Sequence, residues 1–285
     1  TEVKPAMFKD HDQSHKSIME TVLRWAGGKR ALIPHLKEFI PSFNRYFEPF
    51  AGGSAVFFWL VDEGLVDNNA VLSDKNRDLT NLYEHLQFRC EEVLRILKKL
   101  SENHATEPEA HYYKVRGLET RKTRDLGIRR EELIDVAELS DVERAARMLY
   151  LNKTCFNGLY RENKDGAFNV PFGGYKEFNF NEEAIQRSAE SLRHANIYNK
   201  DFEEVLDTAK KGDFVYLDPP YVDTAKGNTF RDYTVDGFSW EDQRRLRKNI
   251  RSLQQKGVHV LLSNNATEET MELYGELDGF GMRRV

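Results

Sequence analysis

The chain has 285 residues, of which 40% are hydrophobic and 31% charged, a balance typical of a globular protein. No stretch of about 18 apolar residues occurs, so we expect no membrane span. The formal net charge of -5 disfavours a nucleic-acid partner unless cations are clustered, because phosphate contacts require Lys and Arg. Cys90 and Cys155 lack Cys-x-x-Cys spacing, which predicts neither a disulfide framework nor a metal site and favours a reducing cytoplasm.

The N-terminal part begins with a polar segment, residues 1–20, which has no signal-peptide core and is expected to be a mobile arm. The loop Trp25-Ala26-Gly27-Gly28-Lys29 then precedes a periodic run over 31–40 that predicts a helix. Its glycine backbone can approach a ligand closely, while Trp25 offers a ring face and Lys29 a charge. A surface turn with a half-buried Trp25 is the alternative interpretation.

A strand, a glycine turn and a helix are predicted at 46–50, 51–54 and 55–61, which is a nucleotide-binding arrangement. The spacing is not G-x-G-x-x-G, and this disfavours a dinucleotide. The next strand, 71–74, ends in Asp74, at the position where an acid can bind ribose hydroxyls. An adenosine-containing ligand without a pyrophosphate is therefore expected, and S-adenosylmethionine fits.

A long helix is predicted over 78–100, and the segment 101–195 then changes in texture. It is rich in charge and poor in apolar strands, which predicts a mainly helical insertion. Its segments 151–161 and 166–175 interleave Asn, Arg and Tyr with Gly, residues that can contact base edges and phosphates but also occur in ordinary loops. The basic clusters at 121–130 and 244–251 could contact phosphates, or be solvated helix faces.

Strands return at 196–198, 214–217 and 258–265, with Asp201 and Phe202 after the first and a basic helix over 239–256. Parallel strands alternating with helices predict a doubly wound, mostly parallel α/β sheet, a Rossmann-like fold with a helical insertion. We expect a catalytic domain over 21–100 and 196–285, and a recognition domain over 101–195.

The strand 214–217 is followed by Asp218-Pro219-Pro220-Tyr221, at an edge where such sheets bind ligands. The exocyclic amine of a heterocycle is a poor nucleophile because its lone pair is delocalised. The Asp218 carboxylate and the Pro219 carbonyl could accept its two hydrogens and localise that lone pair, while Tyr221 stacks on the ring. A simple turn is the alternative, since Asp before Pro favours turns.

Several motifs in the same order resemble the Dam-type, D12-class DNA adenine N6-methyltransferases of the α group. They are Trp-Ala-Gly-Gly-Lys, Phe-Glu-Pro-Phe-Ala-Gly-Gly, Ser-Asp-x-Asn, Phe-Asn-Gly-Leu-Tyr-Arg, Phe-Asn-Val-Pro-Phe-Gly and Asp-Pro-Pro-Tyr, over residues 21–275. The resemblance implies methyl transfer from S-adenosyl-L-methionine to a flipped-out adenine in a short duplex sequence, leaving S-adenosyl-L-homocysteine. GATC is one candidate sequence.

The resemblance also implies roles for individual residues. The catalytic set is Asp218, Pro219, Pro220 and Tyr221. The donor-binding set is Trp25, Ala26, Gly27, Lys29, Phe50, Gly52, Gly53, Ser54, Asp74, Asp201, Phe202 and Asp218. The DNA-binding set is Arg24, Lys29, Phe156, Asn157, Gly158, Leu159, Arg161, Pro171 and Tyr175, with Arg161 at the place of a guanine-contacting arginine.

Two departures from the family pattern bear on specificity and length. Gly174 stands where GATC-specific relatives often carry Arg, and relatives continue past Val285 with a further hairpin strand. Double-stranded DNA is the expected partner, a restriction endonuclease is a candidate genetic partner, and single methylation events require only a monomer.

The tetrapeptide that begins with Asp218 also bears on the alternative functions. Cytosine N4 methylation uses the same chemistry, but Ser commonly replaces the first Asp there. Protein or RNA amine methylation usually shows Asn at that position. An inactive relative that binds donor and DNA is the alternative from another class. A nicotinamide oxidoreductase would leave Asp218-Pro219-Pro220-Tyr221 unexplained.

Overall fold

The computed structural model describes residues 22–221, 238–277, 279 and 281–282, so the predicted arm over 1–20 lies outside the described residues. Its centre is one parallel sheet with the strand order β3-β2-β1-β4-β5. The strands are β1 (Tyr46–Glu48), β2 (Ala70–Ser73), β3 (Ala195–Tyr198), β4 (Phe214–Leu217) and β5 (His259–Leu262). Their apolar and aromatic runs suit a sheet that is covered on both faces.

Alternate residues of the strands enter two separate cores. In β1, Tyr46 packs into one and Phe47 into the other. Helices α2 (Ala55–Asp62), α3 (Arg77–Thr106) and α7 (Glu182–Leu192) supply the first core, whereas α8 (Phe202–Leu206), α9 (Trp240–Lys256) and α10 (Glu268–Gly275) supply the second. The doubly wound α/β fold predicted from the sequence is thus confirmed.

The order of the strands also places a ligand site. From β1 the chain continues to β2 and β3 on one side of the sheet, and later to β4 and β5 on the other. Such sheets bind ligands outside the carboxyl ends of the strands at the point of reversal. Here that point lies between β1, which ends at Glu48, and β4, which is followed by Asp218.

The segment predicted as one helix over 31–40 differs from the expectation. It consists of the 3-10 turn η1 (Lys29–Leu32), a single α-helical turn α1 (Ile33–Leu36) and a second 3-10 turn η2 (Lys37–Phe39). Pro34 has no N–H to extend a helical ladder from the preceding turn, which explains why a long α-helix does not form there.

Helix α3 is the longest of the described helices. It begins after Asn76, whose side chain accepts a hydrogen bond from the Leu79 N–H at 3.1 Å, and it is kinked at Arg89, where φ is -135° and ψ is 33°. None of the helices in the described ranges is long and apolar enough to cross a membrane. Residues 100 and 101 both lie within α3, so the predicted domain boundary does not coincide with the end of a helix. The domain division at 100/101 stays a prediction.

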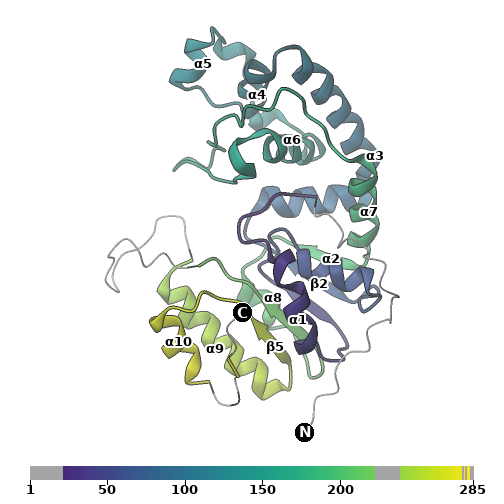
Figure 1. Ribbon diagram of the computed structural model, residues 1–285, viewed down its shortest axis with the longest axis vertical. Coiled ribbons are helices and arrows are strands. Elements are labelled where there is room, and N and C mark those ends of the chain that lie inside the picture. The colour runs from purple at the N-terminus through teal and green to yellow at the C-terminus, as the bar shows by residue number, and fades with distance from the viewer. Residues whose placement is uncertain (1–21, 222–237, 278, 280, 283–285) are drawn as a thin grey trace.

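A helical unit lies between β2 and β3 in the chain. The chain enters this unit through α3. It contains α4 (Pro108–Arg116), α5 (Arg121–Asp125) and α6 (Asp141–Thr154), with the 3-10 turns η3 (Arg130–Glu132), η4 (Val136–Glu138) and η5 (Phe156–Gly158). Figure 1 shows this unit above the sheet and its helices, with α3 and α7 along the right-hand side where the two parts join. The open side between the two parts lies opposite that junction.

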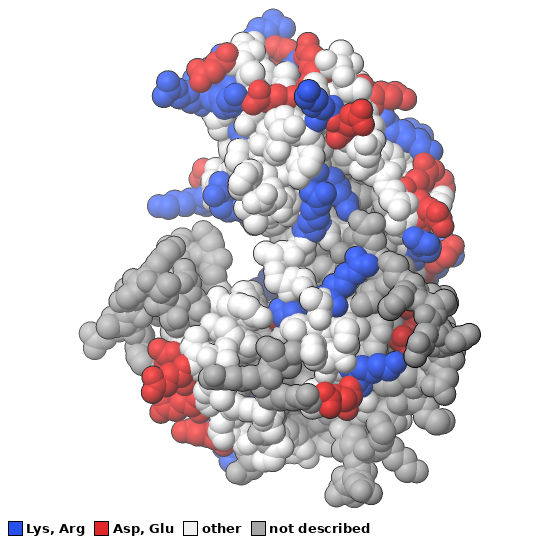
Figure 2. Space-filling model, viewed as in Figure 1, with Lys and Arg blue, Asp and Glu red and all other residues white. Residues whose placement is uncertain are grey.

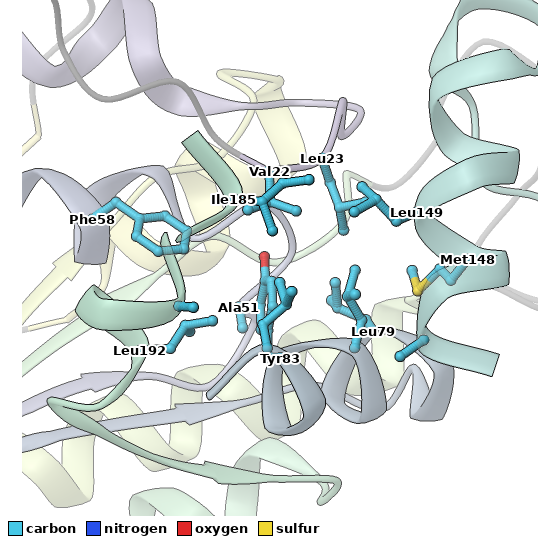
Figure 3. Packing of buried hydrophobic residues seen from close by; sticks show 14 of the residues in the cluster. Val22, Leu23, Ala51, Phe58, Leu79, Tyr83, Met148, Leu149, Ile185 and Leu192 are labelled. Carbon is cyan, nitrogen blue, oxygen red and sulfur yellow. The ribbon is translucent and has the colours of Figure 1, made fainter. Parts of the chain in front are cut away.

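Buried side chains connect the two parts. Leu23, just before the predicted donor loop, points toward Leu149 of α6, while Leu79 and Tyr83 of α3 pack beneath them (Figure 3). Each of these side chains is almost fully buried. The segment that leads into the loop is therefore anchored to the helical unit as well as to the sheet.

Candidate active site

One large cleft, of about 1530 Å³, opens at the carboxyl ends of β1, β2 and β4 and extends to α4 and α6. Figure 2 shows Lys and Arg side chains within the hollow between the two parts of the molecule. Most of the residues predicted for the catalytic and donor sites line this cleft. They are Trp25, Ala26, Gly27, Lys29, Phe50, Gly52, Gly53, Ser54, Asp74, Phe202, Asp218, Pro219, Pro220 and Tyr221, and Arg24 of the predicted DNA-binding set lines the cleft as well.

An ion pair joins the predicted donor loop to the tetrapeptide after β4. Lys29 Nζ lies 2.7 Å from Asp218 Oδ1 and also donates a hydrogen bond to the Gly27 carbonyl at 2.7 Å. Burial raises the pKa of Asp218, and Lys29 opposes that rise. Burial alone would lower the pKa of Lys29, yet Asp218 and Tyr221 together raise it above its ordinary value. The lysine therefore favours the ionised form of Asp218.

Tyr221 presents an open ring beside this pair. Its side chain is 48% exposed, and Lys29 Nζ lies 5.0 Å from the ring centroid. Pro219 is buried, while Pro220 is exposed. The two prolines end β4 because neither can donate to a sheet ladder, and the chain then turns with Asp218 and Tyr221 toward the cleft.

The turn after β1 is built around Trp25. A Cβ on Gly52, whose φ is +46°, would lie 2.9 Å from Trp25 Cδ1, and a Cβ on Gly53 would lie 3.2 Å from Trp25 Cβ. The Gly52 N–H donates to Asp74 Oδ2 at 3.0 Å, so the turn is also fixed by the acid that ends β2. Burial raises the pKa of Asp74, while hydrogen bonds from the Asn76 and Gly52 amides lower it. At Gly52, a side chain would both press on Trp25 and require a left-handed backbone, which favours glycine at this position.

Glu48 and Tyr83 had not been singled out from the sequence, and Glu48 lines this cleft. Glu48, at the end of β1, is buried and accepts a hydrogen bond from Tyr46 Oη at 2.8 Å; burial raises its pKa to about 8. Tyr83 donates a hydrogen bond to the Gly52 carbonyl at 2.6 Å. Glu48 could have been found by the signal that identified Asp74, an acid at the carboxyl end of a strand.

Of the predicted pair Asp201 and Phe202, only Phe202 lines the cleft. Phe202 lines the cleft, where its ring lies 5.3 Å from that of Phe50, and Phe50 also contacts Phe238 edge-on at 5.4 Å. Asp201 instead caps α8 and forms ion pairs with Lys75 at 2.7 Å and Arg245 at 2.9 Å. Of the two, Phe202 thus borders the cleft, with only 2% of its surface exposed, whereas Asp201 holds the start of α8.

The two predicted DNA-reading segments lie side by side. The Phe156 N–H donates to the Pro171 carbonyl at 2.9 Å, and an antiparallel bridge joins Cys155 to Phe172. Phe156 and Leu159 are 50% and 41% exposed, while the intervening Asn157 has φ of 55°. The turn therefore presents two large apolar side chains to solvent.

The remaining predicted DNA contacts surround this pair of segments. Arg161 Nε donates to Asn169 Oδ1 at 2.6 Å, and Arg24 Nη1 donates to Tyr175 Oη at 2.8 Å. Phe156, Asn157, Gly158, Leu159, Arg161, Pro171 and Tyr175 do not line the cleft itself. They form a surface next to it, which Arg24 connects with the donor loop.

The basic clusters noted in the sequence are paired with acids. Lys122 pairs with Glu109 at 2.9 Å and Arg129 with Glu131 at 3.1 Å, while Arg245 of α9 pairs with Glu203 at 2.7 Å. These contacts favour the interpretation of both clusters as helix faces. Cations from α4 and α6 line the cleft instead, and sequence reasoning missed them: Arg116, Arg144, Arg147 and Lys153.

Within the described ranges, no group of three or more His, Cys, Asp and Glu side chains is arranged to hold a metal ion. The fold is that of an α/β protein with a cleft outside the carboxyl ends of its strands, where such sheets bind their ligands.

Comparisons with known proteins agree with this class. The family model of D12 class N6 adenine-specific DNA methyltransferases matches residues 25–283. The type II methyltransferase M1.LlaDCHI of Lactococcus lactis subsp. cremoris is 38% identical over 270 residues, 93% of this chain and 88% of that protein. The retron Ec67 DNA adenine methylase of Escherichia coli is 35% identical, with coverage of 90% and 81%, and the DNA adenine methylase of Serratia marcescens is 34% identical, with 88% and 86%.

The chain belongs to the D12 class of N6 adenine-specific DNA methyltransferases. It is therefore an enzyme that methylates adenine in DNA, and the resemblance inferred from its motifs is confirmed.

Proposed function

We propose that this enzyme transfers a methyl group from S-adenosyl-L-methionine to N6 of an adenine flipped out of a short duplex sequence. The observation that carries the proposal is the meeting, in one cleft, of the glycine turn, Lys29 and the tetrapeptide that begins with Asp218. A donor and an acceptor must lie together for direct transfer, and this cleft is long enough to hold both. The product of the donor is S-adenosyl-L-homocysteine.

In the acceptor half, Asp218 and the Pro219 carbonyl accept the two hydrogens of the amine, and the exposed Tyr221 ring stacks on the base. The donor supplies an electrophilic methyl on sulfur. A nitrogen–carbon bond forms as the carbon–sulfur bond breaks, which leaves a neutral thioether, and the extra proton passes from the nitrogen to Asp218. Positioning and electrostatics thus supply the catalysis, without a covalent enzyme intermediate.

In the donor half, the space above Gly52 and Gly53 suits the methionine and ribose parts of the donor. The absence of side chains on both glycines lets Trp25 pack closely against the turn, which keeps this wall of the donor space in place. Ala26, Gly27 and Ser54 line the same space. Lys29 binds the donor carboxylate, Asp74 the ribose, and Phe50 with Phe202 the adenine ring, while Asp201 fixes Phe202 through its cap of α8.

DNA lies across the opening between the two parts, with residues 101–195 as the recognition domain and 21–100 with 196–285 as the catalytic domain. The exposed Phe156 and Leu159 contact bases, and Asn157, Gly158, Arg161, Pro171, Tyr175 and Arg24 border them. Flipping the adenine costs a few kcal/mol, roughly, which these contacts offset. GATC is one candidate site, and Gly174 is the residue that distinguishes this chain from relatives with Arg there.

The experiment that tests the proposal is methylation-sensitive sequencing of plasmid DNA from cells that express the chain, beside the variant Asp218→Ala. We expect N6-methyladenine in one short motif with the wild type and a loss of more than about 100-fold with the variant, the scale reported for removing one electrostatic group from an active site. Normal methylation by Asp218→Ala would rule out the acceptor role of this carboxylate.

The same experiment gives the recognition site. If a restriction endonuclease is the genetic partner, the enzyme should protect DNA from cleavage at the motif. This is tested by digesting DNA from cells that express the enzyme with an endonuclease that cuts the motif. Protection requires methylation of nearly all sites. The monomeric state is tested by light scattering with and without duplex.

A further inference from the structure

A buried amide, Asn152 near the end of α6, lies between the donor loop and the DNA-reading turn. Its side chain is 2% exposed, and it forms hydrogen bonds in both directions. Oδ1 accepts from the Arg24 N–H at 2.9 Å, and Nδ2 donates to the Arg24 carbonyl at 2.7 Å. Nδ2 also donates to the Gly158 carbonyl at 3.1 Å. One side chain thus holds the backbone of two segments that are far apart in sequence.

Gly158 and the Arg24 side chain also pack closely against each other. Gly158 has φ of +64°, and a Cβ there would lie 2.6 Å from Arg24 Cβ and 2.8 Å from Arg24 Cδ. The Arg24 side chain continues to Tyr175 Oη at 2.8 Å, in the second reading segment. Arg24 and Gly158 thus pack closely, and their carbonyls accept hydrogen bonds from the same Asn152 side chain, so a shift of one would disturb the other.

The next residue carries the connection into the donor site. Trp25 follows Arg24 directly and packs against the Gly52 turn, while its ring lies 5.5 Å from that of Tyr160 in the reading segment. Leu23, just before Arg24, is seated in the core against α6. Trp25 is therefore connected through Arg24 and Asn152 to the turn that carries Phe156 and Asn157.

We propose that Asn152 is a positioning residue that couples donor binding to DNA binding, by holding Arg24 and Gly158 as one hydrogen-bonded unit. This inference rests on the proposed donor and DNA sites. It assigns Asn152 no contact with either ligand, since its polar atoms are already occupied by backbone groups. Its expected effect is on the coupling between the two ligands, which is reciprocal by thermodynamic linkage.

The experiment measures duplex affinity by fluorescence anisotropy with and without saturating S-adenosyl-L-homocysteine, using a duplex that carries the motif found by sequencing. We expect the wild type to bind at least about 5-fold tighter with the nucleoside present, the lower range of allosteric coupling. In Asn152→Ala this ratio should fall to about 1, and the KM for DNA should rise more than kcat falls.

The matched control is Gln87→Ala. Gln87 is also a buried amide, and its Nε2 donates to the Leu192 and Ala195 carbonyls, both at 2.8 Å, where α7 ends and β3 begins. This variant loses two comparable hydrogen bonds and should keep the wild-type ratio. A second variant, Asn152→Asp, keeps the size of the side chain and the acceptor but lacks the donating amide, and it should lower the ratio even if Asn152→Ala fails to fold.

The outcomes separate the two proposals. A wild type that binds both ligands with a ratio of 1, or an Asn152→Asp protein that keeps the wild-type ratio, would overturn the coupling and leave the sites intact. Equal loss of the ratio in Gln87→Ala would reduce Asn152 to a general stabilising residue. A wild type that does not bind S-adenosyl-L-homocysteine would overturn the donor site, and the coupling with it.

Discussion

At the scale of single residues, the ion pair of Lys29 with Asp218 affects the chemistry most directly. Asp218 must be ionised to accept a hydrogen from the amine, and burial works against that state while Lys29 works for it. In Lys29→Met the pKa of Asp218 should therefore rise further, and the acid limb of the kcat/KM profile should move to higher pH. The measurement is the pH dependence of methyl incorporation into duplex DNA.

Lys98→Met is the control for this shift. Lys98 pairs with Glu182 at 3.0 Å on an exposed helix surface, so its removal changes the net charge by the same amount without contact with the cleft. An acid limb that stays in place in Lys29→Met, or moves equally in both variants, would contradict the role given to Lys29.

Gly52 gives a second prediction at this scale. An Ala there must adopt a positive φ and also press on Trp25, so Gly52→Ala should lose stability and most of its donor affinity. Gly127→Ala separates the two effects, because Gly127 has φ of +69° and open space around its Cβ position. Both variants should lose about 1–2 kcal/mol of folding free energy from the backbone alone. Calorimetric titration with S-adenosyl-L-methionine should show weaker binding only for Gly52→Ala, and unchanged binding there would count against the donor turn.

Individual residues were predicted from the sequence where a strand ends in a chemically distinctive group. Asp74 and Asp218 were found in this way because the end of a parallel strand fixes where its next residue lies. The contact of Lys29 with Asp218 was not predicted, since periodicity shows which face of an element is buried but not which distant loops meet. Asn152 was missed for the same reason, because its partners are backbone groups of a remote segment.

At the scale of elements, two histidines in the helical unit make its stability depend on pH. His104 of α3 lies 2.8 Å from Tyr150 Oη and 3.0 Å from the Tyr175 carbonyl, which can only accept, so Nε2 carries the hydrogen. Burial lowers the pKa of His104, and burial lowers that of the nearby His111 of α4 to about 4. Both rings are thus neutral in the folded protein near pH 7.

Because these pKa values are lower in the folded than in the unfolded state, the unfolded state binds more protons. The stability that they contribute is present above the unfolded value of about 6.5 and is lost as the pH falls toward about 4. For His111 the slope is at most about 1.4 kcal/mol per pH unit. Urea unfolding at several pH values between 7 and 4.5 should show this decline, and His111→Gln should flatten it. A variant with the same slope as the wild type would exclude His111 as its source.

The elements themselves were largely predictable. The strands were found because short β-branched and aromatic runs are bounded by turn residues, and β4 (Phe214–Leu217) matches its predicted bounds. The helix over 31–40 was wrong in kind, since Pro34 limits it to a single α-helical turn between two 3-10 turns. Apolar spacing is compatible with both arrangements and could not distinguish them.

At the scale of the whole molecule, the net charge of -5 does not show where the cations lie. The charged residues that α4 and α6 contribute to the cleft are all cations, namely Arg116, Arg144, Arg147 and Lys153. Arg147 also donates to the Val115 and Arg116 carbonyls at 2.9 and 2.6 Å, so it closes the end of α4 while facing the cleft. Composition alone therefore argued against a DNA partner, and only the placement of the charges explains how the enzyme accommodates one.

The position of β1 in the sheet has a consequence for how the chain is made. Tyr46 pairs with Ala70 on one side but with Phe214 on the other. During synthesis the central strand has one neighbour early and must wait for the whole helical unit to be translated before it gains the second. Until then its second edge is an open template for pairing with other chains. A nascent chain of this enzyme thus depends on slow, long-range closure, and chaperone capacity should limit its yield more than the stability of the finished protein does.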